Sequence, residues 1–302
     1  MGGIFAKIAT AFGYILDFIY NYVNNYGVAI ILFTILLKVV LLPFSIRQQK
    51  TMKKTTKVQQ EVKEIQEKYK NDPTKMNTEI YDLYKRENMS PLGGCLPSLL
   101  QFFVILSIFY LVSRPLTYMR HVDSELINNY QTQIQDEREK ETGNRNVNYI
   151  EIAVIKKFGE SDEKVRLNMN FLGLDLSDIP NQNMTNPKVY IIPAFYIATS
   201  FLMMKVTKQM TEAMNAKKKE EDEANVIKRK PLNNEEGEDK VEEEDVEDTM
   251  ASMNKTMRLM MPVMTISIAY IAPLGLTLYW ATSNLLNLGE RMIINKVVKE
   301  EE

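Results

Sequence analysis

The chain has 302 residues with 37 basic and 39 acidic side chains, one histidine and one cysteine. With only Cys95 and His121 available, an internal disulfide framework and the usual zinc centres are excluded, and no histidine-based catalytic triad is expected. The mean hydropathy of −0.23 is an average over long apolar blocks and the charged blocks between them. This alternation is typical of an all-α polytopic membrane protein.

Residues 1–26 are predicted to form an amphipathic helix that lies in the membrane interface, because apolar side chains recur close to a helical stripe. The stripe consists of Ile4, Ile8, Phe12, Ile15, Ile19 and Val23. A transmembrane span over residues 4–23 is the alternative, and it would reverse the orientation given below. The sequence has no basic start with an apolar core and a small-residue cleavage site, so no removable signal peptide is expected.

Residues 27–50 are predicted to form the first transmembrane helix. The stretch is apolar over about 20 residues, the length that crosses a bilayer, and one charge, Lys38, interrupts it. An ammonium group that faces lipid near the middle of a span is strongly unfavourable, so Lys38 is expected to face protein or a water-filled recess. The alternative is that its long side chain reaches the headgroups. Pro43 removes one backbone donor and is expected to bend the helix.

The orientation of the chain follows from the basic residues that flank this span. Lys7 precedes it, and a run of basic residues without an acid follows it, namely Arg47, Lys50, Lys53, Lys54 and Lys57. Because basic loops stay in the cytoplasm, the N-terminus is expected outside and residue 47 onward inside a cell membrane.

Residues 51–90 are predicted to form a cytoplasmic helical hairpin. Each half carries one narrow apolar seam, and the stretch Asn71-Asp72-Pro73 supplies a turn in which Asp72 can cap the second helix. Two roles are open for this hairpin. It is either a solvated strut whose lysines touch anionic lipid or an arm that binds a partner.

The next predicted span covers residues 95–113. Gln101 is its strongly polar side chain and is expected to face other protein or the recess of Lys38. Residues 114–188 then form an extracytoplasmic loop with a helical insertion, and residues 189–206 form the third span.

The remaining chain is expected to return to the cytoplasm twice. Residues 207–255 form an acidic cytoplasmic loop that is largely disordered, because it can bury too little apolar surface to offset its ordering entropy; an acidic partner-binding segment is the alternative. Two short spans follow at residues 257–272 and 275–291. The cytoplasmic tail, residues 292–302, has too few cations for a direct nucleic-acid site.

Several motifs in order along the chain resemble those of one family. Lys38 stands five residues before Pro43; residues 88–101 read NMSPLGGCLPSLLQ, residues 171–176 read FLGLDL, and residues 273–284 read PLGLTLYWATSN. Together with Met261-Pro262, these stretches resemble the YidC/Oxa/Alb family of membrane protein insertases, the five-span bacterial type in particular, over nearly all of residues 20–294. The insertion at 118–168 and the acidic loop at 212–250 fall outside the resemblance.

Two departures from the family pattern are visible. Lys38 stands where most bacterial members have arginine, which keeps the charge and loses the planar guanidinium. Phe102-Phe103 replaces the usual Met-Pro after the glutamine.

The resemblance implies five helices around a hydrophilic groove that is open to the cytoplasm and to lipid. It implies that this groove contains Lys38, Gln101, Trp280, Ser283 and Asn284. The groove would receive the polar or acidic tail of an incoming protein without nucleotide hydrolysis or a cofactor. The implied partners are nascent membrane proteins and the lipid bilayer, with the Sec translocon and the ribosome as further candidates.

Two other function classes compete with this interpretation. A transporter or channel could use Lys38 as a substrate or proton site. Repeated halves with broken helices would favour this interpretation, and the sequence does not show such a repeat. An intramembrane enzyme would need a GxSxG elbow, paired aspartates, an HExxH motif or a P-loop, and none is present. The chain is therefore not expected to be an enzyme.

Overall fold

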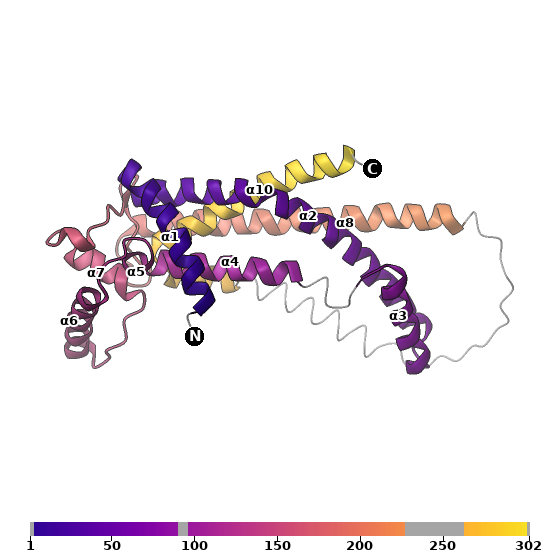
Figure 1. Ribbon diagram of the computed structural model, residues 1–302, viewed down its shortest axis with the longest axis horizontal. Helices are drawn as coiled ribbons and strands as arrows, with labels where there is room; N and C mark the ends of the chain where they lie inside the picture. Colours follow the sequence, from indigo (N-terminus) through magenta and orange to yellow (C-terminus); the bar gives the residue numbers. More distant parts are fainter. Residues whose placement is uncertain (1–2, 90–95, 227–262, 301–302) are drawn as a thin grey trace. The chain divides into compact units, whose positions relative to one another are not determined.

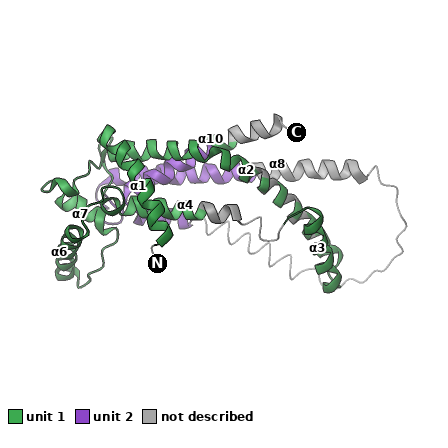
Figure 2. Ribbon diagram, in the orientation of Figure 1, with its two compact units in different colours: residues 1–177, 289–302 green, residues 178–288 purple. Residues whose placement is uncertain are grey.

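The structure is a computed structural model that describes residues 3–89, 96–226 and 263–300 (Figure 1). These residues are mostly helical, with one small two-stranded sheet, so the predicted all-α class is confirmed. Among them, three helices are long and apolar enough to cross a membrane, and a shorter apolar helix accompanies them. The three are Gly3–Val23, Tyr26–Gln49 and Pro187–Gln209, and the shorter one is Phe102–Ser113. The chain divides into two compact units, residues 1–177 with 289–302 and residues 178–288 (Figure 2).

In unit 1, two asparagines join α1 (Gly3–Val23) to α2 (Tyr26–Lys68). Asn24 has a left-handed φ of 49°, which asparagine tolerates better than most residues. The side chain of Asn25 caps α2 by accepting the backbone N–H of Val28 at 3.1 Å. The corner between the two helices is therefore only two residues long.

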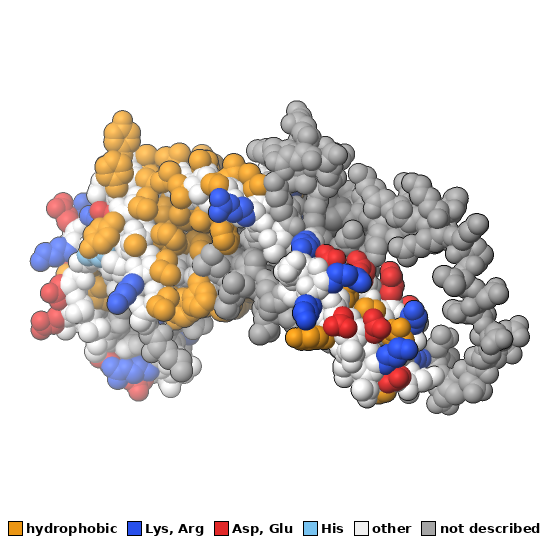
Figure 3. All heavy atoms as spheres, turned by 45° about the vertical axis from the view of Figure 1, so that its right-hand side comes forward, with side chains coloured by type: hydrophobic (Ala, Val, Ile, Leu, Met, Phe, Trp, Pro, Cys, Tyr) orange, Lys and Arg blue, Asp and Glu red, His pale blue; other side chains and the backbone are white. Residues whose placement is uncertain are grey.

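The helix α2 has 43 residues and runs without a break from the predicted first span into the predicted hairpin. The second arm of the hairpin is α3 (Pro73–Arg86). Asp72 caps α3 by accepting the N–H of Lys75 at 2.9 Å, as its sequence context predicts. Glu61 and Arg86 form an ion pair between the two arms at 3.2 Å. Charged side chains gather on these arms in the space-filling view (Figure 3).

Aromatic rings join α1 to its neighbours in unit 1. Phe5 stacks on Phe103 of α4 (Leu96–Ser113) with ring centroids 5.1 Å apart. Phe12 meets Phe33 of α2 edge to face at 5.9 Å. Offset or edge-on contacts of this kind are the favoured geometries of aromatic pairs, and they fix how α1 lies on α2 and α4.

At Gly13, α1 passes very close to the short helix α5 (Pro115–Tyr118). A Cβ at this position would overlap the carbonyl group of Tyr118, so only glycine fits. An ion pair also joins α1 to the residues just after α5: Arg120 donates to Asp17 of α1 at 2.7 Å.

A segment far along the chain, residues 168–171, covers the corner between α1 and α2; we call it the corner clamp. The backbone carbonyl of Asn168 accepts the N–H of Tyr26 at 3.0 Å. The backbone N–H of Asn168 donates to the hydroxyl of Tyr20 at 2.8 Å. The ring of Phe171 fills the space beside Gly27. The N-terminal end of α2 is thereby bonded to a segment far along the chain.

The corner clamp continues into a β-hairpin of β1 (Asn170–Phe171) and β2 (Leu174–Asp175), with Phe171 opposite Leu174. Leu172 and Gly173 form its turn with φ values of 52° and 78°. Two left-handed residues in a two-residue loop make a type I′ turn, in which asparagine and glycine are preferred. A leucine there is strained, and its side chain is 87% exposed.

The loop that follows α5 holds the helices α6 (Ser124–Thr142) and α7 (Ile150–Phe158) and the short 3-10 helix η1 (Glu163–Val165). Tyr130 of α6 stacks on Phe158 of α7 with centroids 4.3 Å apart. Its hydroxyl donates to Asp162 at 2.9 Å. Hydrogen bonds from the N–H of Lys164, the larger cause, and from the hydroxyl of Tyr130 lower the pKa of Asp162. This carboxylate therefore stays ionised and links η1 to α6.

Unit 2 contains η2 (Pro187–Tyr190), α8 (Ile191–Val226), the helical residues 263–271 and the first part of α10 (Leu274–Glu300). The loop at residues 178–186 is bonded to the chain on both sides of the start of α10. The N–H of Leu274 donates to the carbonyl of Asp178 at 2.9 Å, and the N–H of Asn181 donates to the carbonyl of Tyr270 at 3.1 Å. These bonds fix where α10 begins.

Apolar side chains on α1 and α2 remain exposed in unit 1. They include Phe18, Tyr22, Leu32, Val39 and Val40. Hydrophobic side chains form a broad surface in Figure 3. Surfaces of this kind suit lipid rather than water.

Several sequence predictions lie outside the described residues. They are Cys95 with the stretch around it, residues 227–255 of the acidic loop, and residues 257–262 of the fourth predicted span. The interfacial placement of residues 1–26 stays a prediction, since the helix Gly3–Val23 is long and apolar enough to span.

Candidate functional site

Lys38 lies in the middle of the apolar part of α2, 12 residues or about 18 Å along the helix from Tyr26. Its ammonium nitrogen Nζ is 3.1 Å from Oε2 of Glu290 on α10, and both residues belong to unit 1. The lysine side chain is 22% exposed and the glutamate side chain 11% exposed. The cation that interrupts the span is therefore part of a largely buried ion pair, which we call the Lys38–Glu290 pair.

The burial of both charges explains why they are paired. Removing an ammonium or a carboxylate from water is unfavourable by several kcal/mol in a real protein, and only close contact with an opposite charge and further hydrogen bonds offset it. At 3.1 Å the pair supplies that contact. Lys38 also makes a further interaction.

The part of α2 around Lys38 holds other polar groups. Thr34, one turn earlier on the same face, is buried, and its hydroxyl donates to the carbonyl of Ile30 at 2.6 Å. Pro43 has no N–H for the carbonyl of Val39, which therefore lacks its α-helical donor. This section of the span offers a charge and a backbone acceptor instead of a uniformly apolar surface.

Glu290 was not among the residues that the sequence pointed to. A signal for it exists, because an intramembrane cation calls for an acidic partner. Within the predicted spans 27–50, 95–113, 189–206, 257–272 and 275–291, Glu290 is the one acidic residue. Glu290 is 252 residues from Lys38 in the sequence, so no local pattern predicted that the two side chains pair.

In unit 2, polar side chains connect α8 to α10. The amide nitrogen of Asn284 donates to the hydroxyl of Ser200 at 2.9 Å and to that of Thr199 at 3.4 Å. The ring of Trp280 lies against that of Tyr196, with centroids 5.7 Å apart. We call these five residues the α8–α10 seam. Hydrogen bonds between apolar helices of this kind hold them together in a bilayer.

Ser283 lies beside the α8–α10 seam and is bonded to the hydroxyl of Tyr279, one turn earlier on α10. The hydroxyl of Tyr196 is bonded to Ser200 and to Thr265 of the helical residues 263–271. Three helical segments of unit 2 therefore meet through hydroxyl and amide groups. Such groups can exchange partners with a polar peptide at little energetic loss.

The predicted site residues fall into separate parts of the described chain. Lys38 lies in unit 1 with an acidic partner. Trp280 and Asn284 belong to the α8–α10 seam of unit 2, and Ser283 adjoins it. The side chain of Gln101 lies outside the described residues.

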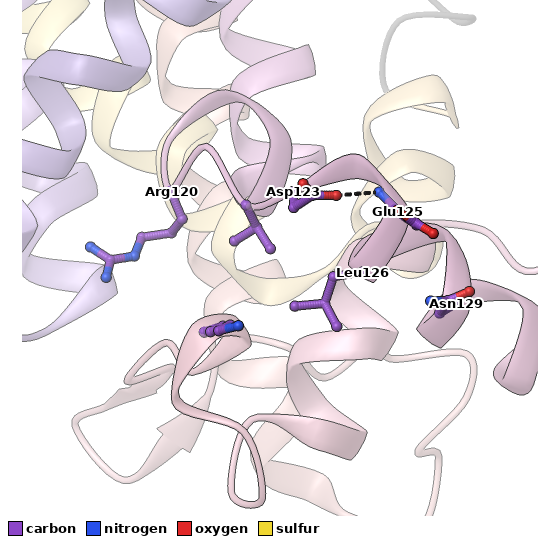
Figure 4. Close-up of a pocket in the computed structure, with 7 residues that line it drawn as sticks. Arg120, Asp123, Glu125, Leu126 and Asn129 are labelled. Atoms are coloured by element: carbon purple, nitrogen blue, oxygen red, sulfur yellow. Dashed lines mark hydrogen bonds between the residues drawn. The ribbon is translucent and has the colours of Figure 1, made fainter.

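A hollow of about 630 Å³ lies in unit 1, beside the loop that precedes α6 (Figure 4). Its lining consists of Arg120, Val122, Asp123, Glu125, Leu126, Asn129 and Lys164. In Figure 4 Arg120 points away from Leu126 and Asn129, because its guanidinium binds Asp17 and Asn21 of α1. Asp123 accepts the N–H of Glu125 at 2.7 Å. With two cations and two acids, the lining favours neither anions nor cations.

No group of three or more histidine, cysteine, aspartate or glutamate side chains placed to hold a metal ion occurs among the described residues. The described polar groups of the site offer charge and hydrogen bonding. They belong to the Lys38–Glu290 pair and to the α8–α10 seam.

The apolar helices, the buried ion pair and the polar seam define a multi-pass protein of the cell membrane. The sequence model of the 60Kd inner membrane protein family matches residues 18–301, and the chain belongs to this family. The resemblance noted in the sequence is thereby confirmed.

Curated relatives of the chain are named membrane protein insertase YidC. The one from Caldanaerobacter subterraneus subsp. tengcongensis is 46% identical over 104 residues, which are 34% of this chain and 50% of the relative. Relatives from Geobacter sp. strain M21 and Pelobacter propionicus are 27% and 28% identical over 98% and 99% of this chain and 38% and 40% of their own length. The chain thus spans half or less of the length of these relatives.

Proposed function

We propose that the chain is a membrane protein insertase, which inserts integral membrane proteins and helps them fold through a hydrophilic groove open to the cytoplasm. The observation that carries the proposal is the Lys38–Glu290 pair, a charged group in the middle of an apolar helix. Charges at this depth mark functional sites rather than packing. The names of the relatives support the same function.

The physical basis is the height of the barrier that a polar tail meets in a bilayer. Each unpaired polar group of a peptide is strongly unfavourable in hydrocarbon. A polar recess that reaches partway across shortens this barrier, while the apolar segment of the client partitions into lipid and supplies the driving free energy. The process involves no chemical reaction and no cofactor.

The residues that the family resemblance assigns to the groove of this proposal come from α2, α4 and α10. They are Lys38, Gln101, Trp280, Ser283 and Asn284. α10 is one continuous helix, and Ser283 and Glu290 are seven residues apart on it, which places them on the same face. This spacing supports a polar lining that continues along α10.

The proposed orientation has the N-terminus outside and the C-terminus in the cytoplasm. The basic residues that follow the first span support it. The hairpin of α2 and α3 then projects into the cytoplasm, where a ribosome or a nascent client can meet it. The chain would act alone or beside the Sec translocon.

Reconstitution tests the proposal. The purified full chain in lipid vesicles should protect the acidic N-terminal tail of a single-span client from external protease, well above empty vesicles. A photo-crosslinking amino acid at position 101 or 284 should form adducts with the client. Protection no better than that of empty vesicles would reject the insertase.

A second measurement separates an insertase from a transporter or channel that uses Lys38. In a Cys95→Ser background, Lys38→Cys should react with a water-soluble maleimide added from the cytoplasmic side alone. Reaction from both sides would favour a pathway across the membrane and contradict the one-sided groove.

A further inference from the structure

The carboxylate of Glu290 occupies the position that a client's acidic group would take in the proposed groove. Its Oε2 lies 3.1 Å from Nζ of Lys38, at ion-pair distance. The glutamate is the more enclosed partner, with 11% of its side chain exposed. An acidic client tail that approaches Lys38 therefore meets a cation that already holds an anion of the chain itself.

The electrostatic consequence depends on the short distance within the pair. Opposite charges about 3 Å apart act against each other on a third charge, and the cancellation becomes more complete as that charge lies farther away. A client carboxylate is attracted by Lys38 and repelled by Glu290, so its net attraction is weaker than that to a lone cation. An uncharged polar tail experiences neither force, and for a cationic tail the two forces exchange sign.

Displacement of Glu290 would not relieve this opposition. A carboxylate that leaves its partner inside the protein keeps its burial and loses its counter-ion, which is the unfavourable half of a broken buried pair. α10 is helical on both sides of Glu290, so its backbone is constrained. The pair is therefore expected to stay formed when a tail enters.

We propose that Glu290 is a selectivity residue of the groove: it neutralises Lys38 so that uncharged polar tails are accepted as well as acidic ones. This inference rests on the proposed insertase function and adds a residue to it. Without Glu290 the ammonium group of Lys38 would lose the carboxylate 3.1 Å away and the site would select acidic tails.

The test uses one single-span client in three forms that differ only in three tail residues, all aspartate, all asparagine or all lysine. The full chain in vesicles is compared with Glu290→Gln and with Lys38→Gln/Glu290→Gln by protease protection. For the wild type we expect the aspartate and asparagine forms to insert within about threefold of each other. Glu290→Gln should raise the aspartate-to-asparagine ratio about tenfold, which corresponds to about 1.4 kcal/mol.

The double variant is the matched control, because it lacks both charges. Its ratio should return close to that of the wild type. If Glu290→Gln inserts the asparagine form normally and its ratio equals that of the wild type, the inference is wrong. If Glu290→Gln lowers the insertion of all three clients by the same factor, the inference is also wrong, because Glu290 would then have only a structural role.

The outcome is separable from failure of the proposed function. Insertion of no client by the wild type would reject the insertase itself, whereas insertion without a change in the ratio rejects only the role of Glu290. If Glu290→Gln does not fold, Glu290→Asp replaces it. Aspartate withdraws the carboxylate by one methylene, so the ratio should move in the same direction by a smaller factor; an unchanged ratio would overturn the inference.

Discussion

Glu151 of α7 accepts two hydrogen bonds from a single residue of α5, Thr117. The backbone N–H of Thr117 donates at 3.0 Å and its hydroxyl at 2.6 Å, across 34 residues of sequence. Glu151 is 2% exposed, an unusual position for a carboxylate. The bonds join α5 to α7.

The burial of Glu151 gives the first prediction, a pH dependence. Desolvation raises the pKa of Glu151, and the bonds from Thr117 oppose the rise only in part. Because the pKa is higher in the folded chain than in the unfolded one, the contribution to stability is fully present below the unfolded pKa and is lost as pH rises through the folded pKa. Glu151→Gln keeps an acceptor and removes the titration.

Thermal unfolding of the wild type and Glu151→Gln in detergent checks this prediction. The glutamine variant should gain stability relative to the wild type between pH 4 and pH 7. A difference that stays constant over this range would contradict it. Glu151→Ala should lose about 1–3 kcal/mol, because the donors of Thr117 are left unpaired in a buried site.

Gly13 and Gly289 form a matched pair for the second prediction. A Cβ at Gly13 would overlap the carbonyl of Tyr118, whereas nothing lies within 4 Å of one at Gly289. Gly13→Ala should destabilise the chain by about 1–3 kcal/mol, as overpacking does. Gly289→Ala should stabilise it by about 0.5–1 kcal/mol, because alanine is the better helix residue. The melting temperature should fall for Gly13→Ala and rise for Gly289→Ala. An unchanged melting temperature for Gly13→Ala would be inconsistent with the close contact.

The third prediction concerns Lys38 itself. Lys38→Ala leaves Glu290 buried without this counter-ion and should cost about 1–3 kcal/mol, less than the 3–5 kcal/mol typical of fully buried pairs because Lys38 is 22% exposed. Lys38→Ala/Glu290→Ala should recover part of the loss. Lys38→Arg retains the charge and should keep stability.

Insertion assays extend this prediction to function. Lys38→Ala should impair clients with acidic tails, because the tail then meets the negative charge of Glu290 alone, whereas Lys38→Arg should keep their insertion. Equal activity of the wild type and Lys38→Ala with such a client would count against a role for charge in the groove.

The fourth prediction concerns the turn of the β-hairpin. Leu172 has a φ of 52° in a turn that favours asparagine. Leu172→Asn should stabilise the chain by about 0.5–1 kcal/mol in thermal unfolding, since the left-handed conformation is less strained for asparagine. Leu172→Ala serves as the control and should not reproduce the gain. An asparagine variant no more stable than the alanine variant would show that the turn stores no strain.

Local signals in the sequence led to much of the fold. The apolar stretch at 27–50 became α2 because length and hydropathy determine a span, and Asp72 before Pro73 became a helix cap because that pattern acts within one turn. The pairing of Lys38 with Glu290 depends on helix packing over long range. No local pattern contains this information.

Other features opposed the usual preferences of their residues. Glu151 is buried although acids are seldom buried, and Leu172 is left-handed although leucine avoids that conformation. The corner clamp escaped prediction for a different reason. Its bonds join residues far apart in the chain, such as Asn168 and Tyr20 across 148 positions, and no local pattern contains such a pairing.

The length of α2 has a mechanical consequence. The helix is about 65 Å long; its N-terminal end is bonded to the corner clamp, while its C-terminal end carries the hairpin. A force on the hairpin acts on α2 as on a lever, and the missing hydrogen bond at Pro43 makes that point its natural joint. Since Lys38 lies five residues from the joint, bending there would change the angle between the hairpin and the part of α2 that holds the buried charges.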